Sequence, residues 1–299
     1  MTISQTTNKI MMMEPAGFHS NPQTMATNTY QSEDPQDVSS VHRQAVEEFR
    51  RIRDHLVEAG VIVVTAIGQY ESPDAVFCNN WVATLSGRRM ALYPMLAENR
   101  RIERRPDIMA FLKDSYDVAL DMSGEEERGC FLESTGSHWL DRVNGIAYFA
   151  LSPRTDEDLA KQWCQHFDFE PIFFHTTNHV GKPVYHTDVM MYIGTSFTGI
   201  CADCIYPEDK SRVLDKIAEY RDIVEITPQQ LRRFCGNSLE LRGTGGKKLL
   251  AMSKSAYDAY SEDQKSHILK HVDEIVYSDI PTIEKYGGGS VRCMLLELH

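Results

Sequence analysis

The sequence predicts a single α/β domain, because segments typical of strands and of helices alternate from one end of the chain to the other. Short runs rich in Val, Ile and Phe alternate with stretches whose apolar residues recur at helical spacing, giving roughly ten or more strands and about five helices. The 299 residues could form one large domain or two smaller ones, but no change in composition marks a linker. We therefore expect one folded domain over residues 10–299, after a disordered polar segment at 1–9.

The first half of the chain begins with an apolar run at 10–13, which predicts a buried strand that ends in a turn. Ala45, Phe49 and Leu56 follow at helical spacing, and Gly60 is expected to end that helix. The next strands are expected at 61–64, 75–77, 90–93, 129–132 and 146–150.

The second half repeats the alternation. A helix is expected to begin at Thr155, where Thr-Asp-Glu-Asp resembles a capping box, and another at Thr227, which is followed by Pro-Gln-Gln. Two further helices are expected at about 210–220 and in the region that ends near residue 270. The strands are expected at 171–174, 189–193, 223–226, 249–252, 275–277 and 291–298.

Charge and hydropathy exclude several classes of partner. Thirty-one Lys and Arg residues against 43 Asp and Glu give a net charge of -12, which repels nucleic acids and anionic membranes. No apolar window reaches the roughly 18 residues of a membrane span, and the polar amino terminus does not resemble a signal peptide. We expect a cytoplasmic protein with a small-molecule partner; whether it forms a homo-oligomer stays open. Neither glycine-rich segment, 243–246 or 287–289, has dinucleotide-binding spacing, so no cofactor is expected.

The seven cysteines, an odd number, are typical of free thiols in a reducing compartment. Cys201 and Cys204 form an isolated Cys-x-x-Cys, which is a weak zinc or redox motif, so no metal is expected. Cys293 is more informative because it follows three glycines, 287–289, that permit close approach of the backbone to a ligand. It is a candidate nucleophile; the alternative is a buried structural cysteine.

A cysteine nucleophile needs a partner for proton transfer, and His186 has the most suitable setting. It precedes Asp188 by two residues, so both side chains would share one face of an expected strand and the carboxylate could orient the imidazole. Glu133 follows an expected strand, where a carboxylate could bind a cationic or amide nitrogen. Asn79 and Asn80 together could donate and accept hydrogen bonds to a polar neutral group. Taken singly, each could also be an ordinary structural residue.

Taken in order, these segments resemble the guanidine-modifying superfamily of arginine deiminases, dimethylarginine hydrolases, amidinotransferases and citrulline-utilising hydrolases. The resemblance implies a five-bladed α/β propeller, or pentein, built of pseudo-repeated ββαβ units around a central site. It rests on Met12-Met13-Glu14-Pro15, Phe77-Cys78-Asn79-Asn80, Glu133-Ser134-Thr135-Gly136-Ser137, Ser152-Pro153-Arg154-Thr155, His186-Thr187-Asp188 and Gly288-Gly289-Ser290-Val291-Arg292-Cys293.

The resemblance also implies a covalent mechanism. Cys293 would attack the central carbon of a guanidino or ureido group, and His186 would protonate the departing amine and then deprotonate water. Glu133 and Asp188 would hold substrate nitrogens. Arg154 would bind the α-carboxylate of the substrate.

The expected substrate depends on Asn80, which stands where the deiminases usually have a carboxylate. An amide both donates and accepts, so it suits a neutral ureido group better than a guanidinium, and we expect hydrolysis of citrulline to ornithine, carbon dioxide and ammonia. An arginine dihydrolase or arginine deiminase is the alternative, and an amidinotransferase or a non-catalytic amino-acid-binding protein are alternatives from other classes. Asn21 is a further expected contact, and Arg101 or Arg104 could assist Arg154.

Overall fold

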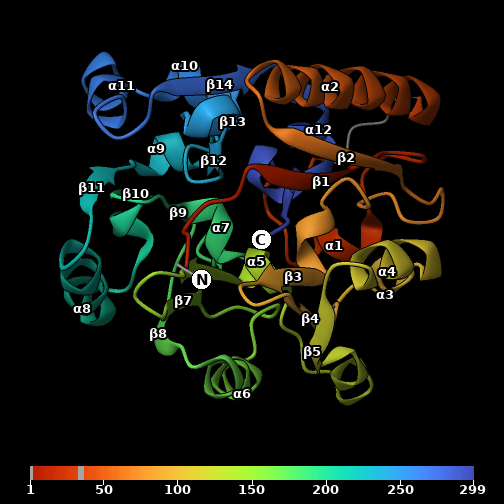
Figure 1. The fold of residues 1–299 in the computed structure, drawn as a ribbon, viewed down its shortest axis with the longest axis horizontal. Helices are drawn as coiled ribbons and strands as arrows, with labels where there is room; N and C mark the ends of the chain where they lie inside the picture. The colour runs from red at the N-terminus through yellow and green to blue at the C-terminus, as the bar shows by residue number, and fades with distance from the viewer. Residues whose placement is uncertain (1–2, 33–36) are drawn as a thin grey trace.

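The computed structural model describes residues 3–32 and 37–299. Within these residues, fifteen strands form five three-stranded sheets. The sheets surround the centre of the molecule, and the longer helices lie on the outside (Figure 1). None of the helices described is both long enough and apolar enough to cross a bilayer.

Four sheets are each built from one continuous stretch of chain in the order strand, strand, helix, strand. In the first of them, β3 runs antiparallel to β4 and β5 runs parallel to β4, so each unit has ββαβ topology. A helical crossover is the usual way to join two parallel strands, which explains the helix before each third strand. The four units are β3 (Val82–Leu85), β4 (Arg89–Leu92), α3 (Glu98–Arg101), α4 (Pro106–Lys113) and β5 (Asp117–Asp121); β6 (His138–Asp141), β7 (Ile146–Ala150), α6 (Glu157–Phe167) and β8 (Glu170–Phe174); β9 (Met191–Ile193), β10 (Phe197–Ile200), α8 (Pro207–Ala218) and β11 (Asp222–Glu225); and β12 (Leu239–Arg242), β13 (Lys248–Ser253), α10 (Lys254–Ala259), α11 (Glu262–Ile268) and β14 (Glu274–Ser278).

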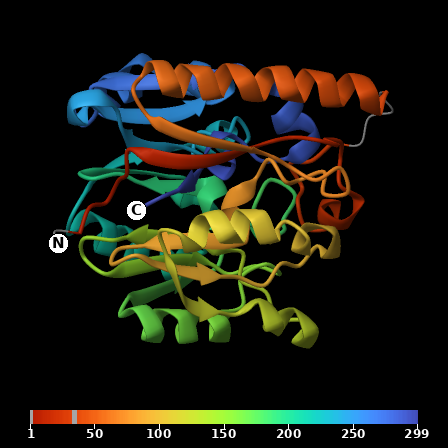
Figure 2. The ribbon, with the colours of Figure 1, turned by 45° about the vertical axis from the view of Figure 1, so that its right-hand side comes forward.

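The fifth sheet joins the two ends of the chain. Its middle strand, β1 (Lys9–Glu14), pairs parallel with β2 (Ile62–Ile67) and antiparallel with β15 (Leu296–Glu297). The helix α2 (Val38–Glu58) connects β1 to β2 and lies along the outside of this sheet (Figure 2). The unit therefore has the same ββαβ order as the others, with its first strand supplied by the far end of the chain.

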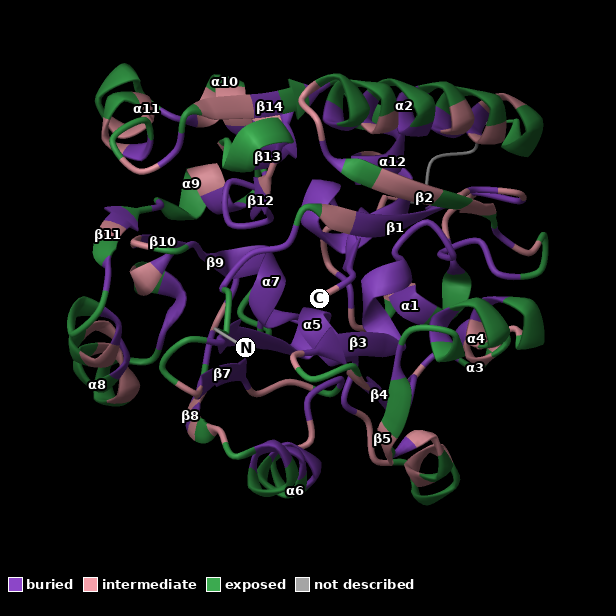
Figure 3. Cartoon of the chain, in the orientation of Figure 1, coloured by how far each residue is buried: buried purple, intermediate pink, exposed green. Residues whose placement is uncertain are grey.

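The helix α2 shows how the sequence builds these outer layers. The Asp37 side chain caps the helix by accepting hydrogen bonds from the backbone N–H groups of Ser39 and Ser40 in its first turn. Apolar side chains on one stripe are buried, and each one larger than alanine contributes about 1.5–3 kcal/mol relative to exposure. The opposite face is exposed, as it is on the other peripheral helices (Figure 3). The buried apolar stripe consists of Val41, Ala45, Phe49, Ile52 and Leu56.

The amino-terminal segment differs from the expectation of disorder over residues 1–9. Residues 3–9 are held against the rest of the chain: the Gln5 side chain donates to the Leu140 carbonyl at 2.8 Å, and the Thr7 hydroxyl to the Leu298 carbonyl at 2.7 Å. These long-range hydrogen bonds order a polar segment that has no apolar periodicity of its own. Residues 1–2 of that expected segment lie outside the described residues.

Several expected strands are replaced by single helical turns. Neither 75–77 nor 129–132 is a strand; they lead into η1 (Cys78–Asn80) and α5 (Ser134–Ser137). The expected strand at 189–193 begins as α7 (Thr187–Met190), and the start of 291–298 is η5 (Val291–Met294). The remaining short helices are α1 (Pro22–Met25), η2 (Ser123–Arg128), η3 (Ala202–Cys204), α9 (Pro228–Leu231), η4 (Thr244–Gly246) and α12 (Pro281–Gly287).

Helix starts follow the capping chemistry of the sequence. The capping box at Thr227 is confirmed, with Gln230 completing it. The start expected at Thr155 lies slightly later, because the Asp156 side chain accepts from the Leu159 backbone and caps α6.

Candidate active site

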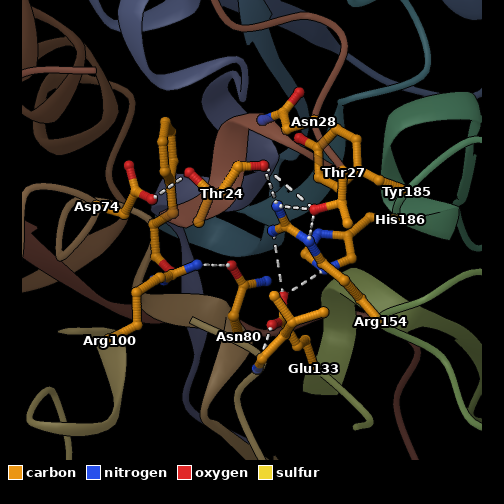
Figure 4. A network of polar contacts seen from close by, with 12 residues as sticks. Thr24, Thr27, Asn28, Asp74, Asn80, Arg100, Glu133, Arg154, Tyr185 and His186 are labelled. Carbon is orange, nitrogen blue, oxygen red and sulfur yellow. Dashed lines mark hydrogen bonds and ion pairs between the residues drawn. The ribbon is translucent and has the colours of Figure 1, made fainter. Parts of the chain in front are cut away.

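A small cavity with a volume of about 10 Å³, enough for about one water molecule, lies between the one-turn helices near the centre of the molecule. Its walls come from segments far apart in the sequence, and several of their side chains point toward one another (Figure 4). The cavity is lined by Thr24, Asn28, Asp74, Phe77, Asn80, Arg100, Arg154, Tyr185, His186, Gly287, Gly289 and Cys293.

Cys293 lies on η5 with its sulfur held between two polar side chains. Its thiol donates to Asp188 Oδ2 at 3.3 Å, and Asn237 Nδ2 donates to the sulfur at 3.1 Å. Burial, followed by the negative charge of Asp188, raises the pKa of Cys293 well above its usual value. The resting protein therefore holds a neutral thiol, and a thiolate requires proton transfer within the site.

Asp188 begins the turn α7 and faces the sulfur. Its Oδ2 also accepts from Asn79 Nδ2 at 3.1 Å, while Oδ1 is buried and makes no hydrogen bond to any described residue. Burial raises the pKa of Asp188, opposed by the positive charges of His186 and Arg292. The free oxygen is therefore available to accept a hydrogen bond from a ligand.

His186 pairs with Glu133 rather than with Asp188. The distance from His186 Nε2 to Glu133 Oε2 is 2.7 Å, and Arg154 Nη1 lies 3.4 Å from the same oxygen. Burial alone would raise the pKa of Glu133, but Arg154 and His186 outweigh it and hold the pKa well below the usual range. Glu133 is thus an ionised carboxylate that orients the imidazole.

The pairing expected between His186 and Asp188 is wrong, and so is the strand geometry behind it. Because Thr187 begins a helical turn, the two side chains do not alternate as on a strand, and Asp188 is directed toward Cys293 instead. The Glu133 carboxylate contacts His186 and Arg154 through Oε2. Its Oε1 accepts a hydrogen bond from the Leu96 backbone N–H at 3.0 Å.

Arg154 reaches the cavity and is bound to α1 and to the turn that follows it. It donates to the Thr24 carbonyl at 3.0 Å and to Thr27 Oγ1 at 2.8 and 2.9 Å (Figure 4). Its guanidinium also stacks over the Tyr185 ring, 4.9 Å from the centroid. A positive charge is therefore fixed at one wall of the cavity.

The orientation of the Asn80 amide is determined by Arg100. Arg100 Nη1 donates to Asn80 Oδ1 at 2.8 Å, and an arginine can only donate, so the oxygen of the amide must face it. Arg100 is itself buried and fixed by Glu103 and by the Phe77 carbonyl, each at 2.8 Å. Asn80 Nδ2 consequently faces away from Arg100, buried and without a hydrogen bond in the described part of the chain.

Gly136 on α5 lies against both Asn80 and His186. A Cβ atom added there would lie 2.5 Å from Asn80 Nδ2 and 2.7 Å from His186 Nδ1. Asn80 and His186 therefore both pack directly against the backbone of Gly136. Any other residue at this position would displace them.

The structure brings most of the sequence-predicted residues together. Cys293, His186, Asn80 and Arg154 line the cavity. Glu133 contacts His186 and Asp188 contacts Cys293, and Asn79 in turn donates to Asp188.

Arg101, Arg104 and Asn21 do not line the cavity. Arg101 and Arg104 lie 3.4 and 2.8 Å from Glu126 Oε2 in ion pairs, because in the single turn α3 it is Arg100 that faces inward. Asn21 caps α1 and donates to Asp74 Oδ2 at 2.8 Å.

Asp74, Arg100 and Asn237 are site residues that the sequence analysis did not identify. Asp74 Oδ1 is buried and accepts no hydrogen bond from the residues described, although Oδ2 accepts from Asn21 and Thr24. Asp74 stands three residues before Phe77, just ahead of a segment that carried the resemblance, and this nearness is a signal that could have found it. Asn237 lies in a loop with no local pattern to distinguish it.

This combination of five ββαβ sheets with a buried cysteine, histidine and glutamate is that of the guanidine-modifying, amidinotransferase-like pentein superfamily. The chain belongs to the family described as N,N dimethylarginine dimethylhydrolase, eukaryotic, which matches residues 14–299. A search of curated proteins finds no match.

Solved structures of the same fold resemble this chain closely in shape and weakly in sequence. The N-terminal domain of ArgZ with a covalent reaction intermediate has a TM-score of 0.76 at 17% identity, covering 97% of each chain. ArgZ is an arginine dihydrolase from the ornithine–ammonia cycle in cyanobacteria. Unliganded AgrE has a TM-score of 0.78 at 17% identity over 97% of this chain and 39% of its own. A dimethylarginine dimethylaminohydrolase adduct has a TM-score of 0.67 at 17% identity, covering 97% and 99%. At 17% sequence identity, these matches show that the chain shares its fold with these proteins and no more.

Proposed function

We propose that this protein is a hydrolase that cleaves C–N bonds of a ureido or guanidino amino acid through a covalent Cys293 adduct, on a five-bladed α/β propeller. The preferred substrate is citrulline, which with one water gives ornithine, carbon dioxide and ammonia. The choice of citrulline rests on one observation: Asn80 Nδ2 is buried and makes no hydrogen bond to any described residue. Arg100 determines the orientation of this amide.

A donor at that position distinguishes the two substrate groups. The ureido group of citrulline has a carbonyl oxygen that can accept from Asn80 Nδ2, whereas a guanidinium has only N–H groups and would meet it donor to donor. The free Asp188 Oδ1 can accept from a ureido N–H. A buried polar atom left unpaired costs about 1–3 kcal/mol, so this pairing favours the ureido group.

The other residues have defined parts in this proposal. Cys293 forms the bond to the ureido carbon as its proton passes to Asp188, the acceptor of the thiol hydrogen bond, and His186, oriented by Glu133, gives its proton to the departing amine. His186 then deprotonates the water that releases the adduct as a carbamate, which loses carbon dioxide, and Asp188 returns its proton to the sulfur. Arg154 binds the α-carboxylate, which takes the place of the Thr24 carbonyl as acceptor.

Arginine dihydrolysis is the second candidate. It is favoured by the free carboxylate oxygens of Asp74 and Asp188, which could accept from a guanidinium. It also agrees with the fold shared with ArgZ, although a sequence identity of 17% is too low to transfer the substrate of one protein to the other.

The test is to incubate the purified protein separately with citrulline, arginine and N,N-dimethylarginine, and to measure ornithine, citrulline, ammonia and dimethylamine. We expect ornithine and ammonia from citrulline with no added amine acceptor, which also excludes obligate amidino transfer. The proposal of citrulline as substrate would be overturned if the protein only converted arginine to citrulline, or if it only released dimethylamine from N,N-dimethylarginine. Thermal stabilisation by citrulline without turnover would indicate a binding protein.

The nucleophile has a matched control. Cys293→Ser should abolish turnover, whereas Cys130→Ser, at a partly exposed thiol outside the cavity, should retain it. Activity retained in Cys293→Ser would refute the covalent mechanism.

A further inference from the structure

A cluster of one carboxylate and two imidazoles lies on the surface, remote in sequence from the candidate active site. Asp222 begins β11, His267 lies on α11, and His271 lies in the loop between α11 and β14. One ligand atom from each residue lies within 4.8 Å of those of the other two. The imidazole rings of the two histidines lie 5.6 Å apart between centroids, so both face the same region of the surface.

His271 is held as a metal-binding histidine is usually held. Its Nδ1 is 2.9 Å from Ser196 Oγ, and its ring stacks on Phe197 with centroids 5.0 Å apart and planes 14° apart. A hydrogen bond to one ring nitrogen commonly orients the other nitrogen toward a metal. Here that other nitrogen, Nε2, faces the cluster.

The Nε2 atom of His271 supplies an independent indication of a ligand. It is buried and makes no hydrogen bond to any residue among 3–32 and 37–299, although Asp222 Oδ2 is only 3.3 Å away. A cation bound between the imidazole and the carboxylate would give this buried nitrogen the partner that it lacks among those residues.

We propose that Asp222, His267 and His271 bind a divalent transition-metal ion of the zinc class. Tetrahedral zinc with bonds of about 2.0–2.1 Å separates its ligands by about 3.3 Å, close to the distance between Asp222 and His271. The set lacks sulfur and contains two imidazoles, which favours Zn²⁺ and Co²⁺ over Mg²⁺ and Ca²⁺. Water completes the fourth position, because Asp222 is exposed.

The site would join two neighbouring units of the fold. Asp222 belongs to the sheet β9–β11, whereas His267 and His271 belong to the connection into β14 of the next sheet. A bound ion would therefore link the two units and stabilise the folded protein, independently of the proposed reaction.

The decisive experiment is titration of the purified full chain with Co²⁺, followed by visible absorption. We expect one equivalent with d–d bands and no thiolate-to-cobalt charge transfer, which separates this site from Cys201, Cys204 and Cys293. His267→Ala should weaken binding at least about tenfold, as should Ser196→Ala through loss of orientation of His271. The matched control is His175→Ala, at an exposed histidine that pairs with a single carboxylate, Asp209; it should bind as the wild type does.

A thermal measurement checks the same site without cobalt. In a Cys293→Ser background, Zn²⁺ should raise the melting temperature, Mg²⁺ should not, and His267→Ala should remove the increase. The proposal is overturned if Co²⁺ binds only with thiolate charge transfer, if it binds unchanged to folded His267→Ala, or if no binding occurs. In the last case the cluster is only an ion pair between Asp222 and His271.

Discussion

Asn80 and Arg100 show how a single residue contact can fix the orientation of a side-chain amide. Arg100 is almost completely buried, so its charge must be paired, and Glu103 supplies that pairing at 2.8 Å. The remaining donor of Arg100 fixes the Asn80 oxygen and thereby presents the Asn80 nitrogen to the cavity. A positive side chain behind the amide thus decides which end of the amide a ligand meets.

Replacing Asn80 by Asp should invert this preference. The aspartate offers only acceptors, so we expect kcat/KM for citrulline to fall by about 10–100-fold, the cost of one lost hydrogen bond and one unpaired acceptor. Arginine should gain in relative kcat/KM. Asn144→Asp, in the turn before β7, is the control, and equal losses for both substrates would contradict the argument.

Glu284 gives a pH dependence with a defined sign. Burial raises its pKa from 4.5 to about 7, although Ser253 and Ser290 lower it by hydrogen bonding. The folded state thus binds this proton more tightly than the unfolded state does. The resulting stability is fully present below about pH 4.5 and is lost as the pH rises through about 7, by up to about 3 kcal/mol.

Glu284→Gln should remove that loss. We expect the melting temperature of the wild type to fall between pH 5 and 8, and that of the variant to change less over the same interval. Parallel curves for the two proteins would show that Glu284 does not titrate there.

At the scale of elements, the site is built from single helical turns. η1 carries Asn79 and Asn80, α7 carries Asp188, and η5 carries Cys293. Turns of three or four residues have too few positions to show periodicity, so the sequence predicted strands for some of them. The long helix α2 was predictable because its apolar stripe is visible in the sequence, and the short helix α9 was predictable because its cap at Thr227 is.

Gly136→Ala tests the packing between α5 and its neighbours. The added methyl group would collide with Asn80 and His186, so we expect kcat/KM to fall at least about a hundredfold, with about 1–3 kcal/mol of destabilisation. Gly124→Ala is the control, since no atom lies within 4 Å of the added carbon. Similar kinetics in both variants would contradict the close approach.

Site residues were predictable where they lie in a short sequence motif. They were not predictable where tertiary packing alone brings them to the cavity. Cys293, His186 and Asn80 stood in recognisable segments, and the structure places all three around one cavity. Arg100 and Arg101 are adjacent and chemically identical, and only the orientation of α3 decides which faces inward. The partner of His186 was mistaken for the same reason, because the histidine and Glu133 meet only in the folded chain.

At the scale of the whole molecule, the alternation of strands and helices predicted the composition of the fold, and the resemblance supplied the five repeated units. What the pattern could not show was the pairing of β15 with β1. Those two strands are separated by nearly the whole described chain, and a pairing over such a distance has no local signal.

That pairing has a consequence for the order of events in folding. Bringing Ile10 beside Glu297 closes a loop that costs about 5 kcal/mol in chain entropy, so this step is expected late. Because η5 adjoins β15, Cys293 reaches its partners only when the ring closes.

After dilution from denaturant, far-ultraviolet circular dichroism should therefore recover before enzyme activity. Recovery of both at one rate would argue against late closure. If ring closure is late, the return of enzymatic activity reports the rate of the last folding step. Partly assembled intermediates would have native secondary structure but would lack the assembled site around Cys293.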